Sequence, residues 1–402
     1  MSLEEKVEMN SINYPVEDGY SIRKVTELSE FEKLGELWDT LANRQGVYKP
    51  FLCFDWFKIW LDHFLRDQKL LILLVHKQNE LCTIAPCLIK EKHWGGINVR
   101  KIELIGNAYS PFRYFLFNGL NEVETQRSIS YILRFLLKEY RNWDMVDLSG
   151  IPEEDNWFDL LRVTIKQGGL KYEESVCYGD WYLDGIDCSG DEYLNRLPDK
   201  IRKDVSYCKR RLQKMGQYEF RLIRGDERID YYMDLYYGVY AKSWQEREGI
   251  GPTFHRDLGK ISAKHHWLRL GFLLLNDYPI ASQFWISWKG TAFILKTVYD
   301  QDFKKYSPGK ILTSEMAKFA IDFDKVKTID YVQGDEGYKQ DWTPKRRERK
   351  GVVVFNNSIK GKSLELLSNR IRPMVNRNTY LRKAKAIIKG YIPNRIEEVT
   401  TL

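Results

Sequence analysis

The order of predicted secondary-structure elements repeats along the chain, and this repeat limits the folds available to it. Residues 70–90 contain two strand-like apolar segments around a short turn at Gln78–Glu80, which predicts a β-hairpin. The elements that follow are strand-like segments at 99–106 and 112–118, a helix over 122–140, and a strand over 145–150.

The second copy has the same order. Its elements are a hairpin over 268–288 with a turn at Asp277–Pro279, a strand at 291–300, a helix at 309–323, and a strand at 327–334. Hairpins combined with a strand–helix–strand crossover predict an α/β (α+β) fold of two tandem halves, each a mixed, mostly antiparallel sheet flanked by helices. The expected parts are a leader at 1–20, a first half at 21–150, a second half at 151–355, and a basic helical tail at 356–402.

Composition predicts a globular cytoplasmic protein without a metal centre. The 402 residues are 43% apolar and 14% aromatic, enough for a packed core. The longest apolar run, Leu70–Val75, is far shorter than the roughly 20 residues of a membrane span. The acidic start MSLEEKVEMN has no signal-peptide pattern. Six cysteines occur without the spacing of a zinc site or a disulfide framework, so we expect free thiols, most of them buried.

Positive charge is concentrated at the end of the chain. Residues 356–402 carry ten Lys or Arg against three Glu, an excess of +7 that equals the net charge of the whole chain. Such a tail favours an anionic membrane surface or an acidic partner, and it is equally compatible with a solvated helix. Localisation at the inner face of a membrane is therefore compatible with the cytoplasmic prediction.

The segment 296–312, KTVYDQDFKKYSPGKIL, runs from a strand through a basic loop to a helix start. Pro308 fixes the turn, and Gly309 lets the backbone approach a ligand. The free N–H groups of the first helical turn suit a pyrophosphate, and Lys304, Lys305 and Lys310 add positive charge. A Pro-Gly pair before a helix is also an ordinary turn.

The corresponding helix of the first copy begins differently. It follows the segment 118–126, NGLNEVETQ, which is acidic and would repel phosphate. We therefore expect a single cofactor site, in the second half.

Polar residues also gather at two strand ends near this loop. The strand before it carries Lys296, Thr297 and Tyr299, and the next strand ends in 334–342, GDEGYKQDW. Open α/β sheets gather their ligands at the carboxyl ends of strands. The alternative is a polar cluster that satisfies its own hydrogen bonds.

Three segments together, 202–214 (RKDVSYCKRRLQK), 296–312 and 330–342 (DYVQGDEGYKQDW), carry a resemblance to a known family. The chain resembles the GNAT-type acyltransferase superfamily, in particular the tandem-GNAT branch that includes the CelD/BcsL polysaccharide-biosynthesis proteins, and more distantly the Fem-type aminoacyl transferases. The resemblance implies direct transfer of an acyl group, expected from acyl-CoA and most often acetyl-CoA, to an amine on a sugar or cell-envelope precursor. The loop YSPGK has fewer glycines than the pyrophosphate loop of ordinary GNAT enzymes.

The chemistry of direct transfer assigns expected roles to residues of these segments. It needs a deprotonated amine, stabilisation of the tetrahedral oxyanion, and a proton for the leaving thiolate. Asp335 is the expected base or amine-orienting group. Lys339 resembles the lysine of the Fem-type motif and would stabilise negative charge. Tyr299 or Tyr338 would protonate the thiolate.

Binding roles follow for two further sets. The residues expected to bind the cofactor are Tyr306, Ser307, Pro308, Gly309, Lys310 and Ile311. Those expected to bind the substrate are Arg202, Lys203, Lys296, Trp244 and Trp342. For Arg202 and Lys203 the alternative is a solvated basic helix face, and for Trp244 it is a helix core. The histidines at 255, 265 and 266 lie in or beside a linker-like segment without metal-ligand spacing.

Two other functions stay open at this point. The acyl donor could be an aminoacyl-tRNA, as in Fem-type proteins, although no sustained heptads are found here. The chain could also be a non-catalytic partner of a polysaccharide synthase, docked through its basic tail. Apart from tRNA in the first of these, no nucleic-acid partner is expected.

Overall fold

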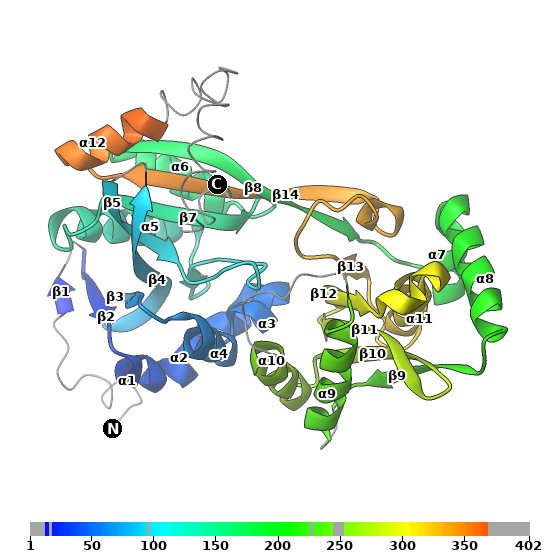
Figure 1. The fold of residues 1–402 in the computed structure, drawn as a ribbon. Coiled ribbons are helices and arrows are strands. Elements are labelled where there is room, and N and C mark those ends of the chain that lie inside the picture. Colours follow the sequence, from blue (N-terminus) through cyan, green and yellow to red (C-terminus); the bar gives the residue numbers. More distant parts are fainter. Residues whose placement is uncertain (1–12, 16–17, 95–96, 226–227, 244–252, 369–402) are drawn as a thin grey trace. The chain divides into compact units, whose positions relative to one another are not determined.

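The computed structural model describes residues 13–15, 18–94, 97–225, 228–243 and 253–368, and its fold is mixed α/β (Figure 1). The chain divides into two compact units. The first contains residues up to 45, 65–177 and 348 onward, and the second contains 46–64 and 178–347. The division falls inside two strands, β8 (Lys171–Leu183) and β14 (Lys345–Phe355).

The first unit has the strand order β1-β2-β3-β4-β5-β7-β14-β8. Its other strands are β1 (Asn13–Pro15), β2 (Tyr20–Val25), β3 (Lys69–Lys77), β4 (Glu80–Trp94), β5 (Ile97–Leu104), β6 (Leu116–Phe117) and β7 (Met145–Pro152). Its helices are α1 (Leu28–Phe31), η1 (Glu32–Leu34), α2 (Gly35–Ala42), α5 (Glu122–Lys138), α6 (Trp157–Gln167) and α12 (Ile359–Leu366), and η2 (Asn43–Tyr48) crosses the division. Strands β5 and β7 are parallel, joined through α5.

The second unit has the strand order β8-β13-β12-β11-β10-β9. Its other strands are β9 (Tyr218–Ile223), β10 (Leu268–Leu275), β11 (Tyr278–Trp288), β12 (Thr291–Tyr299) and β13 (Thr328–Asp330). Its helices are α3 (Lys49–Leu52), α4 (Phe54–Phe64), α7 (Gly190–Arg196), α8 (Asp199–Gln213), α9 (Ile229–Tyr240), α10 (Thr253–Lys264), η3 (Gln301–Tyr306), α11 (Pro308–Asp322) and η4 (Lys339–Asp341). Strands β12 and β13 are parallel, and α11 joins them. Both units thus contain the predicted hairpin and crossover, and the fold class is confirmed.

Two-residue turns set the hairpins. The β3–β4 turn has positive φ at Gln78 and Asn79, and the β10–β11 turn has it at Asn276 and Asp277. Two consecutive positive φ values are the requirement of a type I′ turn, whose twist matches that of the flanking strands. The second turn lies one residue earlier than predicted.

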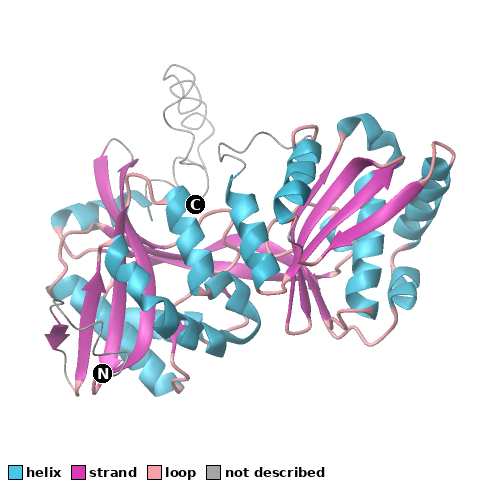
Figure 2. Cartoon of the chain, turned by 90° about the horizontal axis from the view of Figure 1, so that it is seen from below, coloured by secondary structure: helices cyan, strands magenta, loops and turns pink. Residues whose placement is uncertain are grey.

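Helices cover both faces of the sheet in the second unit (Figure 2). Neighbouring residues of a strand point to opposite faces. Accordingly Trp285 lies in the core beneath α11, while Phe284 contacts rings of α9 and α10. Helix α11 buries Ile311, Leu312 and four further apolar residues of its sheet-facing side, which are Met316, Ala317, Ala320 and Ile321.

Several predicted details are wrong. The helix predicted to reach Phe323 ends at Asp322, and the side chain of Phe323 is 71% exposed and stacks on Phe319. Residues 112–118 form only the two-residue strand β6, and β13 ends at Asp330. The linker-like segment around His255 contains the helix α10.

Candidate functional site

Strands β12 and β13 pair over a short stretch and then end at different points. In the described chain, their parallel pairing runs only from Thr291 to Phe293 on β12, opposite Thr328 to Asp330 on β13. β13 ends there, while β12 continues to Tyr299. Beyond Phe293, β12 therefore no longer pairs with β13. A strand that diverges from its neighbour can accept an extended ligand through main-chain hydrogen bonds.

A β-bulge lies at the point where β12 leaves β13. On β11, Phe284 pairs with Lys296 and Trp285 pairs with Ile294, so Leu295 is the extra residue. A bulge re-aims the side chains that follow it. The bulge turns Thr297 and Tyr299 toward the start of α11, where a Cβ built on Gly309 would lie 3.7 Å and 3.4 Å from their side chains.

On the other face, Lys296 lies beside α9 and α10. Its Nζ is 5.7 Å from the centroid of the Tyr240 ring. Lys296 also acts on His255 of α10: burial, and next the charge of Lys296, lower the pKa of this histidine to about 3. The imidazole is therefore neutral at pH 7. No role was predicted for His255, because the segment that forms α10 resembles a linker in its sequence.

The beginning of α11 is held by a buried hydrogen-bond network. The side chain of Gln283, fully buried, donates to Gly309 O at 3.2 Å and to Thr313 Oγ1 at 2.7 Å. Its own Oε1 accepts from Trp285 Nε1 at 2.8 Å. Ser307, just before the helix, adopts φ +47°, and Pro308 occupies the first turn. A satisfied buried network fixes its members in one geometry, so this helix start is pre-organised.

The electrostatics of this helix start favour an anion. The first turn of α11 contains no acidic residue, whereas the first turn of α5 in the first unit contains Glu122 and Glu124. The helix dipole places partial positive charge at the N-terminus. Lys304 and Lys305 are exposed beside it, as predicted, but Lys310 pairs with Asp204 at 2.8 Å.

Arg211 of α8 supplies a further charge that the sequence analysis did not select. Its Nη1 donates to Lys305 O at 3.0 Å, and its guanidinium lies 5.0 Å from the centroid of the Tyr306 ring. The basic stretch of α8 was noticed in the sequence, but Arg202 and Lys203 were chosen from it. The helical period shows which residues of α8 share a face. It does not show which end of α8 contacts the loop, because that depends on packing.

Comparison with protein families agrees with this geometry. Residues 199–340 match the family model described as an acetyltransferase (GNAT) domain. These residues include α8, the β12–β13 divergence, and the whole of α11. This part of the chain is a GNAT acetyltransferase domain by the family model.

Solved structures resemble the chain in fold at low sequence identity. FemX has 12% identity and a TM-score of 0.54, with 82% of this chain and 98% of that chain covered. A tandem GNAT protein from the clavulanic acid biosynthesis pathway has 10% identity and a TM-score of 0.45, with 84% and 99% covered. A conserved protein of unknown function from Bacteroides thetaiotaomicron VPI-5482 has 16% identity and a TM-score of 0.47, with 82% and 98% covered. No curated protein matches the chain.

The predicted cofactor residues of the GNAT domain lie together. Tyr306 is buried under Arg211, and Pro308, Gly309 and Ile311 are buried at the helix start with Ser307 and Lys310 beside them. Tyr299 lies against Gly309. These residues therefore lie next to one another at the start of α11.

Asp335 belongs to a separate cluster. It accepts hydrogen bonds from Arg346 Nε at 2.7 Å, from Arg346 Nη2 at 3.1 Å, and from Gly179 N at 3.0 Å. Hydrogen bonding from Arg346 lowers the pKa of this carboxyl group. A carboxylate held in this way is a weak proton acceptor at neutral pH.

Lys339 is buried and bound within its own loop. Its Nζ lies 2.8 Å from Glu336 and donates to the carbonyl oxygen of Gln333. Tyr338 is exposed, with its ring edge against Tyr331. Among the described contacts, none joins Asp335 or Lys339 to Tyr299 or Gly309.

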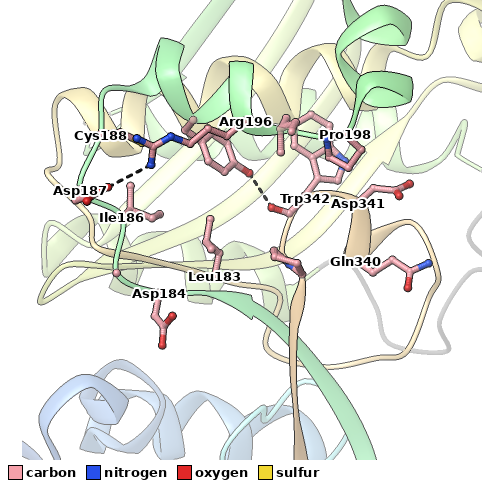
Figure 3. A pocket seen from close by; sticks show the side chains of 14 residues that line it. Leu183, Asp184, Ile186, Asp187, Cys188, Arg196, Pro198, Gln340, Asp341 and Trp342 are labelled. Atoms are coloured by element: carbon pink, nitrogen blue, oxygen red, sulfur yellow. Dashed lines mark hydrogen bonds and ion pairs between the residues drawn. The ribbon is translucent and has the colours of Figure 1, made fainter.

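The predicted substrate residues are dispersed. Arg202 and Lys203 are exposed near the beginning of α8, and both pair with Asp199. Trp342 is buried and lines a pocket of about 390 Å³ (Figure 3). Trp244 lies outside the described residues.

The described residues hold no group of three or more His, Cys, Asp or Glu side chains arranged to bind a metal ion. None of the helices described is long and apolar enough to cross a membrane. The six cysteines are free; Cys177 and Cys188 are half-buried and the other four are buried.

Proposed function

We propose that the GNAT domain transfers an acyl group directly from acyl-CoA, with acetyl-CoA the expected donor, to an amine on a sugar or cell-envelope precursor. The observation that carries this proposal is the divergence of β12 from β13 beside the pre-organised start of α11. On this strand-to-helix segment, β12 would pair with an extended ligand, and the start of α11 would bind an anion. An acyl-CoA has this chemistry, because its pantetheine arm is extended and rich in amides and its pyrophosphate is anionic.

The residues present fit such a donor. The pyrophosphate would lie at the N-terminus of α11, near Gly309, with Arg211 and Lys305 beside it. The pantetheine amides would run along β12 beyond its pairing with β13, between Ile294 and Tyr299. This order along the strand brings the thioester toward the bulge at Leu295.

The bulge supplies a stabilising group for the transfer step. Bulged backbone is released from the regular ladder, so an N–H near Leu295 can donate to the oxyanion of the tetrahedral intermediate. Tyr299 contacts the start of α11 at the pyrophosphate end of this arrangement, four residues and about 13 Å along the strand from the bulge, so it would bind the donor there and not protonate the thiolate. In this arrangement Asp335 holds Arg346 and the backbone of Gly179 rather than the acceptor.

The acceptor amine would approach on the face that carries Lys296 and His255. The charge of Lys296 disfavours an ammonium ion beside it and lowers the pKa of a bound amine. The neutral imidazole of His255 then accepts a hydrogen bond from the amine and orients its lone pair. An ammonium acceptor releases one proton to solvent as it binds, and the neutral amine attacks the thioester carbonyl. The C–S bond then breaks, and the proton lost from nitrogen as the amide forms passes through solvent to the departing CoA thiolate.

A binding and turnover series tests the donor first. Isothermal titration should show acetyl-CoA and CoA binding to the full chain, and a thiol-release assay should show turnover with amino-sugar nucleotides as acceptors. Saturation at 100 times Kd would also add about 2.7 kcal/mol to the free energy of unfolding. If aminoacyl-tRNA supports transfer and acetyl-CoA does not bind, the donor assignment is wrong. If neither donor binds, the chain is a non-catalytic partner.

A further inference from the structure

A pocket of about 390 Å³ opens in the second unit between the end of β8, the α7–α8 junction and the segment after Lys339 (Figure 3). It lies beyond the residues that would hold acyl-CoA, none of which lines it. Sites for small molecules typically have volumes of several hundred Å³ with mostly apolar walls and a few polar groups.

The walls of the pocket are apolar and rigid. Trp342, Tyr193 and Ile186 belong to the core of the unit and form its inner side. The Tyr193 hydroxyl donates to the carbonyl oxygen of Trp342 at 3.0 Å, which joins α7 to the segment after Lys339. Pro198 and Pro344 restrict the backbone at two other walls. The space is therefore built into the fold.

The rim of the pocket is acidic. In Figure 3, Asp184, Asp187 and Asp341 lie around the outside of the apolar centre. Two of these carboxylates are neutralised, since Asp184 pairs with Lys345 and Asp187 pairs with Arg196. Asp341 makes no side-chain hydrogen bond or ion pair with any residue that the structure describes. One uncompensated carboxylate thus stands at the edge of an aromatic pocket.

We infer that this pocket binds a primary amine whose apolar or aromatic body fits against Trp342 and Tyr193 while its ammonium group reaches Asp341. Aromatic faces attract cations, and a hydrogen bond between an ammonium and a carboxylate is stronger than one between neutral groups. The uncompensated carboxylate of Asp341 disfavours an anionic ligand. The inference does not depend on acyl transfer.

Titration with matched probes tests the recognition of charge. Tyramine and cyclohexylamine should bind to the full chain, and N-acetyltyramine, which has the same ring as tyramine but no charge, should bind at least tenfold more weakly than tyramine. Asp341→Asn should weaken tyramine at least tenfold. Asp62→Asn, an exposed carboxylate on α4, should leave it unchanged. Equal affinities for tyramine and N-acetyltyramine, or no binding of either amine at millimolar concentration, would overturn the inference.

Cys188 reports binding at this pocket itself. Its half-buried thiol is a lining residue, and the half-buried Cys177 of the first unit is an internal control. Saturating tyramine should slow alkylation of Cys188 by iodoacetamide several-fold, measured by peptide mass spectrometry, with Cys177 unaffected. This measurement uses the unaltered chain, so it tests binding in the pocket even if Asp341→Asn misfolds. Unchanged alkylation of Cys188 under saturating tyramine would show that the amine binds elsewhere.

Discussion

At the scale of single residues, glycine at position 309 would be required by the close approach of the acyl donor and not by the fold. A Cβ there would meet Tyr299 and Thr297 at ordinary contact distances, so the fold accepts alanine. We expect Gly309→Ala to lower the affinity for acetyl-CoA about tenfold while the free energy of unfolding stays equal or rises by up to about 1 kcal/mol. Titration calorimetry and denaturant unfolding measure the two effects.

The matched control for that variant is Gly238→Ala. Gly238 also lies in a helix, and a Cβ there meets open space. It should alter stability in the same direction without changing acetyl-CoA binding. Unchanged affinity in Gly309→Ala would mean that the backbone at 309 does not approach the donor.

Lys296 provides the second prediction at this scale, through the pH dependence of turnover. Its charge would lower the pKa of a bound amine, so Lys296→Met should move the rising limb of kcat/KM to higher pH by up to about one unit. Because burial and Lys296 hold the pKa of His255 at about 3, this histidine should add no limb near pH 6.5.

The profile is measured between pH 6 and 10 with an amine acceptor. Lys289→Met, in the turn between β11 and β12, removes a lysine outside the site and should leave the limb in place. If the rising limb stays at its original pH in Lys296→Met, Lys296 does not act on the pKa of the acceptor amine.

At the scale of elements, α8 has two basic ends with different surroundings. Arg211→Met should weaken acetyl-CoA binding about tenfold, corresponding to about 1.4 kcal/mol, and reduce its salt dependence, because Arg211 contacts the loop before α11. Arg202→Met, at the exposed end of the same helix, should have little effect. The reverse order of effects would place the donor's phosphate groups at the beginning of α8, where Arg202 and Lys203 were predicted to bind the substrate.

The crossover of the first unit shows why only the second of the two units is expected to bind an acyl donor. There β5 ends at Leu104, just after its pairing with β7. Lys101 pairs with Glu103 of the same strand at 2.6 Å and with Asp147 of β7 at 2.8 Å. In the first unit, the point equivalent to the end of the β12–β13 pairing therefore lies next to a buried ion network.

This network predicts a pH dependence of stability. Although burial acts in the opposite direction, Lys101 and Lys90 lower the pKa of Glu103 to about 2. The folded pKa is below the unfolded value of about 4.3, so the stabilisation is complete above that value and is lost as the pH falls toward 2. Denaturant unfolding of the first unit should show this loss, and Glu103→Gln should cost roughly 3 kcal/mol at pH 7 and much less at pH 2. A pH-independent cost would mean that packing, and not charge, is lost.

At the scale of the whole molecule, the basic tail is separable from the proposed chemistry. Most of it, 369–402, lies outside the described residues. We propose that it serves docking to an anionic surface or partner. Removal of 369–402 should leave kcat and KM on soluble acceptors unchanged and abolish sedimentation with vesicles that contain anionic lipid. Loss of turnover on soluble substrate would make the tail part of the catalytic unit.

The sequence alone determined the elements and their repeated order. Alternating apolar residues and turn signals located the hairpins, and the helical period located α11, because these patterns depend on neighbours along the chain. Pro308, Gly309 and the acidic start of α5 were sufficient to place the expected donor site in the second half. The GNAT resemblance came from the same segments.

Only the tertiary structure decided which of the polar residues act together. It brought Arg211 to the loop and left Arg202 exposed, bound Asp335 to Arg346, and placed His255 beside Lys296. It also assigned α4, which precedes the strands of the first unit, to the second. These outcomes depend on contacts between residues far apart in the chain, and on one extra residue at the β12 bulge. Local periodicity records neither.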